Sequence, residues 1–178
     1  MEVRLSTARL LLRPFRPEDV EDVFAYTADA KVMRFIEPPF LWEEGQRFVQ
    51  RFGCVEKPAV YALVEKASRK VIGHTIFHPL DQEEIYELGW IIGAPYQRLG
   101  YASEIGGALL EFGFERMGLH KICAETVGGN AASLRVMEKL GMRREAVLRS
   151  QRLHQGEWLD VVWYGILKEE YRAFKGRR

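Results

Sequence analysis

The stretch from Trp90 to Ala102 reads WIIGAPYQRLGYA, and its pattern decides which fold is predicted. An apolar run typical of a strand ends at Ile92, and a short loop with Arg98 and Gly100 leads into a predicted helix from Tyr101. The first turn of a helix leaves several backbone N–H groups without partners, and the aligned peptide dipoles add partial positive charge there. A turn of this kind is suited to binding a phosphate.

Two residues of the loop strengthen this interpretation. Gly100 has no side chain, so a bulky anion can approach the backbone closely. Arg98 could add a charge-assisted hydrogen bond. Taken alone, the stretch is explained equally well as an ordinary strand-to-helix turn. It is not a P-loop, because no Gly-Lys-Ser/Thr follows, and it lacks the three spaced glycines of a dinucleotide-binding turn.

The residues before this stretch predict a strand, then helices, then a meander. Pro17 is followed by two acidic residues, a combination that suits the first turn of a helix. Further helix is expected up to Phe52, with a break at Pro38-Pro39. β-branched and aromatic residues then predict consecutive strands. In order, the expected elements are a strand over 9–15, a helix from 17, helices over 28–52, and strands over 60–65, 71–77 and 85–92.

The residues after the stretch predict alternating helices and strands. A helix is expected over 101–117, a strand over 121–127, a helix over 130–140, and a hairpin of 147–153 with 158–167. The second of these helices stops at Gly141, where glycine can adopt the left-handed conformation. A meander followed by alternating elements predicts an α/β fold, in which a mixed sheet carries helices on its faces.

Composition limits the class of protein. The 178 residues, 47% hydrophobic and 29% charged, predict one globular domain over 1–178. With 26 basic and 25 acidic residues scattered along the chain, there is no basic footprint of a nucleic-acid binder. No run approaches the ~20 apolar residues of a membrane span, and the start lacks a secretory signal. Cys54 and Cys123 are too few for a disulfide framework, so a cytoplasmic protein is expected.

A second informative stretch runs from Asn130 to Met142 and reads NAASLRVMEKLGM. Asn130 precedes a helical pattern and is a strong N-cap candidate. Ser133 lies in the first turn of that helix. Each of these features is common in helices that serve no catalytic function, so the stretch gains meaning only in combination with the first one.

In combination, the two stretches resemble the GNAT (GCN5-related N-acetyltransferase) family. The similarity is greatest to its RimJ/RimL-type branch, which acetylates amino termini and small amines. The resemblance extends over nearly the whole chain, in the order typical of the family. It is carried by residues 9–14, 89–102, 130–133 and 138–142.

The resemblance implies the GNAT fold, with a mixed, mostly antiparallel central sheet and helices on both faces, and acetyl-CoA as co-substrate with no metal. The family motif Gln/Arg-x-x-Gly-x-Gly/Ala matches residues 97–102, whose amides would hold the pyrophosphate of coenzyme A. The preceding strand would splay from its neighbour, pair with the pantetheine arm, and offer one N–H to the thioester oxygen. Asn130 would bond the arm, and Ser133 would lie near the sulfur. The implied binding residues are Trp90, Ile91, Ile92, Gln97, Arg98, Leu99, Gly100, Tyr101, Ala102, Asn130 and Ser133.

The chemistry of acetyl transfer suggests a base. Amide formation from a thioester needs a neutral amine, and roughly a tenth or more of an α-amine is uncharged at neutral pH, because its pKa is only about 7.7–8.0. Glu87 is the predicted base, since strand alternation places it on one face with Gly89 and it could take the proton through a water. The alternative is that Glu87 is a solvent-facing strand carboxylate. His74 and Asp160 are weaker candidates.

Ser133 is the predicted acid, because a hydroxyl beside the sulfur can pass a proton to the leaving thiolate. Tyr164 is a weaker candidate for this role. The resemblance also places Arg152 where related ribosomal enzymes carry an acidic residue near the substrate. That difference argues against a ribosomal substrate.

The acceptor is left open among a protein amino terminus, a small amine, a polyamine and an antibiotic amine. Five carboxylates could form an acidic patch that favours a polyamine, or could simply be solvated: Glu43, Glu44, Glu83, Glu84 and Glu87. Two functions without turnover also remain, a coenzyme-A-binding sensor or scaffold and an anion-binding module. The family is often dimeric, so the resemblance also implies a homodimer.

Overall fold

The computed structural model describes residues 3–53 and 55–176. Their contacts group them into two compact units. The first unit contains the described residues up to His78 together with Trp90–Ile105. The second contains Pro79–Gly89 and the described residues from Gly106 onward. Strand β5 (Ile85–Ile92) therefore contributes its first residues to the second unit and its last residues to the first.

The strands of the first unit form an antiparallel meander. Leu12 lies opposite Leu63, and Leu63 in turn lies opposite Gly73. Beyond the end of β5, the Gly93 amide donates a hydrogen bond to the Ile72 carbonyl at 2.8 Å. The other strands of this meander are β1 (Leu5–Ser6), β2 (Leu10–Arg13), β3 (Val60–Glu65) and β4 (Val71–Pro79).

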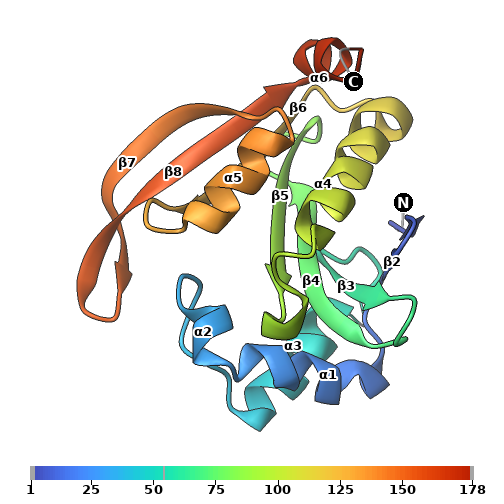
Figure 1. Ribbon diagram of the computed structural model, residues 1–178, viewed down its shortest axis with the longest axis vertical. Helices are drawn as coiled ribbons and strands as arrows, with labels where there is room; N and C mark the ends of the chain where they lie inside the picture. The colour runs from blue at the N-terminus through green and yellow to red at the C-terminus, as the bar shows by residue number, and fades with distance from the viewer. Residues whose placement is uncertain (1–2, 54, 177–178) are drawn as a thin grey trace. The chain divides into compact units, whose positions relative to one another are not determined.

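Helices connect β2 to β3 and supply much of the core of the first unit. In Figure 1, α1 and α3 lie side by side. Phe15, Val23 and Val49 are buried together with residues of β3 and β4. A Cβ at Gly53 would lie only 2.1 Å from the Cβ of Phe15, so glycine is what allows this close packing. These helical elements are a 3-10 turn (Pro17–Asp19), α1 (Val20–Thr27), α2 (Ala30–Met33) and α3 (Trp42–Gly53).

A buried ion pair fixes the entry into α1. Arg13 Nη1 and Nη2 lie 2.7 and 2.8 Å from the two carboxylate oxygens of Asp19, and both side chains are nearly inaccessible to solvent. The Arg16 amide also donates to the Asp19 carboxylate, at 2.7 Å. The bidentate geometry is the strong form of this pairing.

The second unit contains a mixed ladder. β5 is parallel to β6 (Lys121–Val127), which is antiparallel to β8 (Glu157–Leu167), and β8 is antiparallel to β7 (Arg143–His154). The β7–β8 hairpin turns at Gln155 and Gly156, both with positive φ, and Figure 1 shows α5 beside it. α4 (Tyr101–Glu111) begins in the first unit and enters the second at Gly106. The helical elements of the second unit that follow are a π-helical segment (Phe112–Met117), α5 (Ala131–Lys139) and α6 (Lys168–Lys175).

The predicted fold class, a mixed and mostly antiparallel sheet with helices, is confirmed, because β5–β6 is parallel whereas β1–β2, β2–β3, β3–β4, β6–β8 and β7–β8 are antiparallel. The helical expectation over 28–52 is wrong in part: helix is confined to α2 and α3, and residues 34–41 are not helical. β1 and α6 were not anticipated. The assignment of 1–178 to one domain stays a prediction. No helix within 3–53 or 55–176 combines the length and apolarity needed to cross a bilayer.

Candidate functional site

The turn between β5 and α4 has the geometry that the sequence predicts. A single 3-10 turn (Ala94–Tyr96) follows β5, and α4 begins at Tyr101. Gln97 Nε2 donates to the Ile92 carbonyl at 2.9 Å, so the Gln97 side chain holds the loop against the end of the strand. Residues 97–100 are all exposed. The free N–H groups of the first turn of α4 therefore follow a loop that a ligand can reach.

The loop backbone is bent by two left-handed residues, Arg98 with φ 63° and Gly100 with φ 84°. Turns that include left-handed residues can direct successive N–H groups into one concavity that binds anions. A non-glycine residue in this conformation is uncommon. The geometry favours an anionic ligand at the N-terminus of α4.

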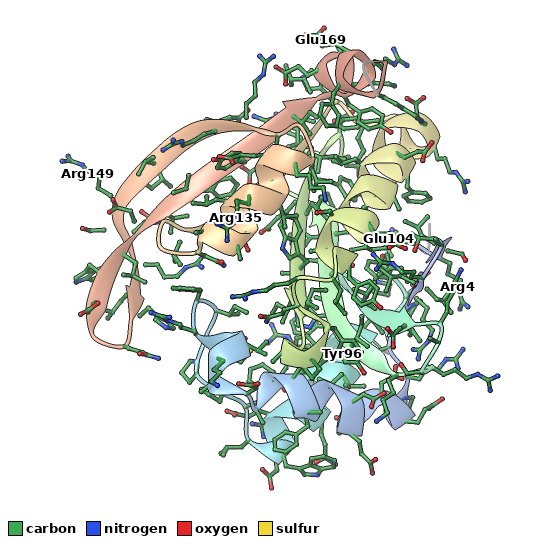
Figure 2. All side chains as sticks on the ribbon, viewed as in Figure 1. Arg4, Tyr96, Glu104, Arg135, Arg149 and Glu169 are labelled. Carbon is green, nitrogen blue, oxygen red and sulfur yellow. The ribbon has the colours of Figure 1, made fainter. Side chains whose placement is uncertain are left out.

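A hydrogen-bonded brace supports the loop from the residues between β1 and β2. Arg9 Nη1 donates to the Leu99 carbonyl at 2.9 Å, and Arg9 Nε lies 2.7 Å from Glu104 Oε2. Thr7 Oγ1 and the Arg9 amide also donate to Glu104, which Figure 2 labels on α4. Burial alone would raise the pKa of Glu104, but these hydrogen bonds lower it below its usual value. No local sequence pattern reveals this role of Glu104, because the contacting residues are far apart along the chain.

The Tyr101 side chain has a partner of its own. Its hydroxyl donates to Glu65, and the Arg9 guanidinium lies 4.3 Å from the centre of its ring. Hydrogen bonds from Tyr101 and Ser68 lower the pKa of Glu65. Of the Tyr101 groups, the backbone N–H is therefore the one suited to a ligand.

The β5 backbone has an edge suited to an extended ligand. The parallel pairing with β6 ends at Glu87 opposite Cys123, although β5 continues to Ile92 and β6 to Val127. No described residue of β5 after Glu87 is paired with β6. An unpaired strand edge can take up an extended amide-bearing chain as an additional strand.

Asn130 caps α5 in the second unit, as predicted. Its Oδ1 accepts a hydrogen bond from the Ser133 amide at 3.3 Å, and its Nδ2 donates to Ser133 Oγ and Thr126 Oγ1, each at 3.1 Å. Ser133 is half-buried. The Asn130 amide thus fixes the Ser133 hydroxyl next to the helix N-terminus.

Glu87 is half-buried on β5, directly opposite Cys123 on the parallel strand β6. Burial raises the pKa of the Cys123 thiol, and the charges of Glu145 and Glu87 raise it further, whereas Lys121 lowers it. Cys123 is therefore a buried, protonated thiol; Cys54 lies outside the described residues. Glu87, Asn130 and Ser133 belong to the second unit, and the loop 97–102 belongs to the first.

A cavity of about 910 Å³ lies within the first unit, beside the loop-bearing strand. No local sequence pattern predicts this cavity, because its walls come from residues 36–40, α3, the start of β3, β4 and the end of β5. Eight lining residues are apolar: Ile36, Phe40, Phe48, Phe52, Ala59, Val60, Ile76 and Ile91. Seven are polar or charged: Glu37, Glu44, Arg47, Gln50, Arg51, His74 and His78.

His74 is the most deeply buried polar residue of that cavity, with 4% of its surface exposed. Its Nδ1 lies 2.9 Å from the Tyr26 hydroxyl, and its ring centre lies 5.0 Å from that of Phe48. Burial lowers the pKa of His74 from 6.5 to about 3. The imidazole is therefore neutral at physiological pH.

A family model described as an acetyltransferase (GNAT) domain matches residues 9–143. The chain belongs to the GNAT acetyltransferase family. Members of this family transfer acetyl groups from acetyl-CoA, so this GNAT protein is an acetyl-CoA-dependent acetyltransferase.

Relatives of this GNAT acetyltransferase extend over almost the whole chain. The N-acetyltransferase YnaD of Bacillus subtilis is 38% identical, with 95% of this chain and 99% of the relative covered. A GNAT-family acetyltransferase from Bacillus anthracis has a crystal structure that is 38% identical, with a TM-score of 0.88 and coverage of 94% and 99%. The [ribosomal protein uS5]-alanine N-acetyltransferase of Escherichia coli is 23% identical, with 90% and 89% covered. The predicted similarity to the RimJ/RimL-type branch is thus supported by a distant relative.

The other candidate residues of this acetyltransferase have structural partners. Asp160 Oδ1 accepts from the Ser150 amide at 2.9 Å at an irregularity of the β7–β8 pair. The Tyr164 hydroxyl donates to Glu138 at 3.2 Å, and burial followed by that hydrogen bond raises the Tyr164 pKa. Arg152 forms an ion pair with Glu125. Each of the three side chains thus has a structural partner, and the catalytic roles considered for Asp160 and Tyr164 stay predictions.

The buried His74 predicts a pH-dependent stability. The unfolded chain protonates this residue below about pH 6.5, whereas the folded chain does so only near pH 3. Stability therefore falls as pH decreases through this window. Between pH 7 and pH 5, we expect His74 to account for a loss of about 2 kcal/mol in the free energy of unfolding.

Urea unfolding at these two pH values measures this contribution. The His74→Gln variant should lose about 2 kcal/mol less than the unmodified protein over the same interval. The matched control is His120→Gln, at an exposed histidine, which should leave the pH dependence unchanged. An identical pH dependence in the His74→Gln variant and the unmodified protein would contradict the burial effect.

Proposed function

We propose that this acetyltransferase moves the acetyl group of acetyl-CoA directly to a primary amine, within a ternary complex. The acceptor is the α-amine of a protein amino terminus or a small amine. The supporting observation is a continuous path of backbone in the first unit, where the unpaired edge of β5 leads into the exposed turn 97–100 and the start of α4.

Each part of acetyl-CoA has a candidate partner. The diphosphate would lie against the backbone amides between Gln97 and Ala102, with Arg98 as an additional positive charge. The pantetheine arm would extend along β5 from Trp90 to Ile92, where one N–H would face the thioester oxygen. Asn130 would bond the arm through its side-chain amide.

The proposed chemistry needs one base and one acid. The amine nitrogen attacks the thioester carbonyl carbon, the C–N bond forms, and the C–S bond breaks to release coenzyme A. Glu87 would take the amine proton through a water, and Ser133 would pass a proton to the leaving sulfur. An α-amine requires less of the base than a lysine side chain, since its pKa is about 7.7–8.0 rather than about 10.4.

The competing function is a sensor that binds acetyl-CoA without turnover. The loop would remain functional in such a protein, so binding alone does not distinguish the two. Release of free thiol from acetyl-CoA in the presence of amines does, because a sensor releases none. The homodimer implied by the family resemblance stays a prediction that sedimentation analysis can test.

The Glu87→Gln substitution should lower turnover by about 100-fold, a typical contribution of a general base. Acetyl-CoA binding measured by calorimetry should not change, because the substitution preserves size and lies outside the loop 97–102. The control is Glu83→Gln, at an exposed carboxylate of the turn before β5. Undiminished turnover in the Glu87→Gln variant would remove Glu87 from the mechanism.

A further inference from the structure

The cavity of the first unit has an apolar floor and a charged rim. Its aromatic wall is formed by Phe40, Phe48 and Phe52, with ring centres 5.8 and 5.1 Å from that of Phe48. These three rings are only half-buried, so each presents a face that a ligand can contact. About 910 Å³ lies in the size range of small-molecule sites. The floor thus favours an aromatic or branched aliphatic group.

The charges at the rim limit the charge that the rest of the ligand can carry. Glu37, Arg47 and Arg51 are exposed, and Glu44 accepts a hydrogen bond from the Leu41 amide at 2.7 Å at the start of α3. Two guanidinium groups therefore balance two carboxylates around the opening. A polyamine, which carries several positive charges, would gain little from such a rim. A ligand with one amine is better matched.

His74 supplies a polar contact at the floor. The Tyr26 hydroxyl is its one hydrogen-bond partner among the described residues, and it engages Nδ1. Burial raises the pKa of the Tyr26 hydroxyl, which therefore keeps its proton. The tautomer assigned to His74 is the one in which this O–H donates to Nδ1 and the ring proton lies on Nε2. A buried N–H in an apolar cavity favours a neutral acceptor such as a carbonyl oxygen.

We propose that this cavity selects the acceptor, and that the acceptor is an α-amine attached to a bulky apolar side group, whose neighbouring carbonyl oxygen accepts a hydrogen bond from His74 Nε2. This inference rests on the proposed function, because it specifies the substrate of the same reaction. The chemical class is shared by amino-acid amides and by peptides with a large apolar first residue. Phe48 is the specificity-determining wall, and His74 is a residue that positions the carbonyl.

The test compares acceptors by thiol release from acetyl-CoA. The panel pairs phenylalanine amide with glycine amide, and a tripeptide beginning with phenylalanine with the same tripeptide beginning with glycine, and adds spermidine. We expect kcat/KM for each phenylalanine acceptor to exceed that of its glycine counterpart by about tenfold to 100-fold. Comparison of the amino-acid amides with the tripeptides shows which of these two kinds of acceptor is preferred.

Substitutions in the cavity test whether it causes the preference for phenylalanine acceptors. Phe48→Ala should reduce the phenylalanine preference to about threefold or less, mainly through KM, since an apolar contact is lost. His74→Leu should raise KM for both acceptors of a pair, whereas His74→Gln, which keeps an N–H near the position of Nε2, should restore much of the loss. The control is Leu41→Ala, at an exposed apolar residue that does not line the cavity.

Three results would overturn the inference. These are equal rates with glycine and phenylalanine acceptors, spermidine as the best acceptor, or an unchanged preference in the Phe48→Ala variant. In all three, thiol is still released, so acetyl transfer itself stands. If acetyl-CoA binds but no amine in the panel releases thiol, the proposed function fails together with the inference.

Discussion

The Gly100→Val substitution is expected to weaken acetyl-CoA binding by about 100-fold. Gly100 has φ 84°, a left-handed conformation in which a β-branched residue is a genuine outlier that costs about 1–3 kcal/mol. The added methyl groups would also occupy space on the loop through which the diphosphate must approach the amides. Calorimetric titration with acetyl-CoA measures the change in Kd.

A second glycine with a similar φ separates the effect of backbone strain from a direct effect on acetyl-CoA binding. Gly118 has φ 76°, and no atom lies within 4 Å of the position that its Cβ would take. Gly118→Val should therefore cost similar strain and lower thermal stability while leaving the Kd for acetyl-CoA within about threefold. If both variants lose binding equally, or if Gly100→Val binds as the unmodified protein does, the loop is not the diphosphate site.

The Asp19→Ala substitution is expected to lower the free energy of unfolding by about 3–5 kcal/mol, the largest stability effect anticipated in the first unit. The side chains of Arg13 and Asp19 are only 10% and 6% exposed, so removing the carboxylate leaves a buried guanidinium without its counter-charge. It also removes the acceptor of the Arg16 amide at the entry to α1. Urea unfolding followed by circular dichroism measures the loss.

Two further variants show whether the unpaired buried charge causes this loss of stability. Glu18→Ala, at an exposed carboxylate in the same turn, should change stability by less than about 0.5 kcal/mol. The double variant Arg13→Met, Asp19→Leu should recover much of the loss, because no unpaired charge remains buried. If Asp19→Ala lowers the free energy of unfolding no more than Glu18→Ala does, the buried ion pair does not contribute measurably to stability.

Local patterns predicted the elements with a strong periodicity. The boundaries of β5 and β6 match the sequence expectation, because β5 is rich in β-branched and aromatic residues and β6 contains the β-branched residues Ile122, Thr126 and Val127. The helix stop at Gly141 is confirmed by its φ of 81°. The predicted break in the helix at Pro38-Pro39 is present but longer than expected, because residues 34–41 are not helical. The two-residue β1 is too short to leave a pattern.

The candidate site was predictable only where it is contiguous in sequence. The loop 97–102 and the Asn130 cap were located by their own residues, and the structure shows the turn and the cap there. The brace between Arg9 and Glu104 joins residues that are 95 positions apart, and the cavity wall joins three strands to α3. Such long-range contacts depend on tertiary packing, so the local spacing of residues in the sequence does not predict them.

The most direct test of the diphosphate site is amide NMR of the isotope-labelled protein during titration with coenzyme A. We expect large shifts of the N–H resonances between Leu99 and Ser103 with coenzyme A. Pantetheine, which lacks the diphosphate, should leave them nearly unchanged. If these resonances do not move with coenzyme A, or move equally with pantetheine, the turn before α4 does not hold the diphosphate.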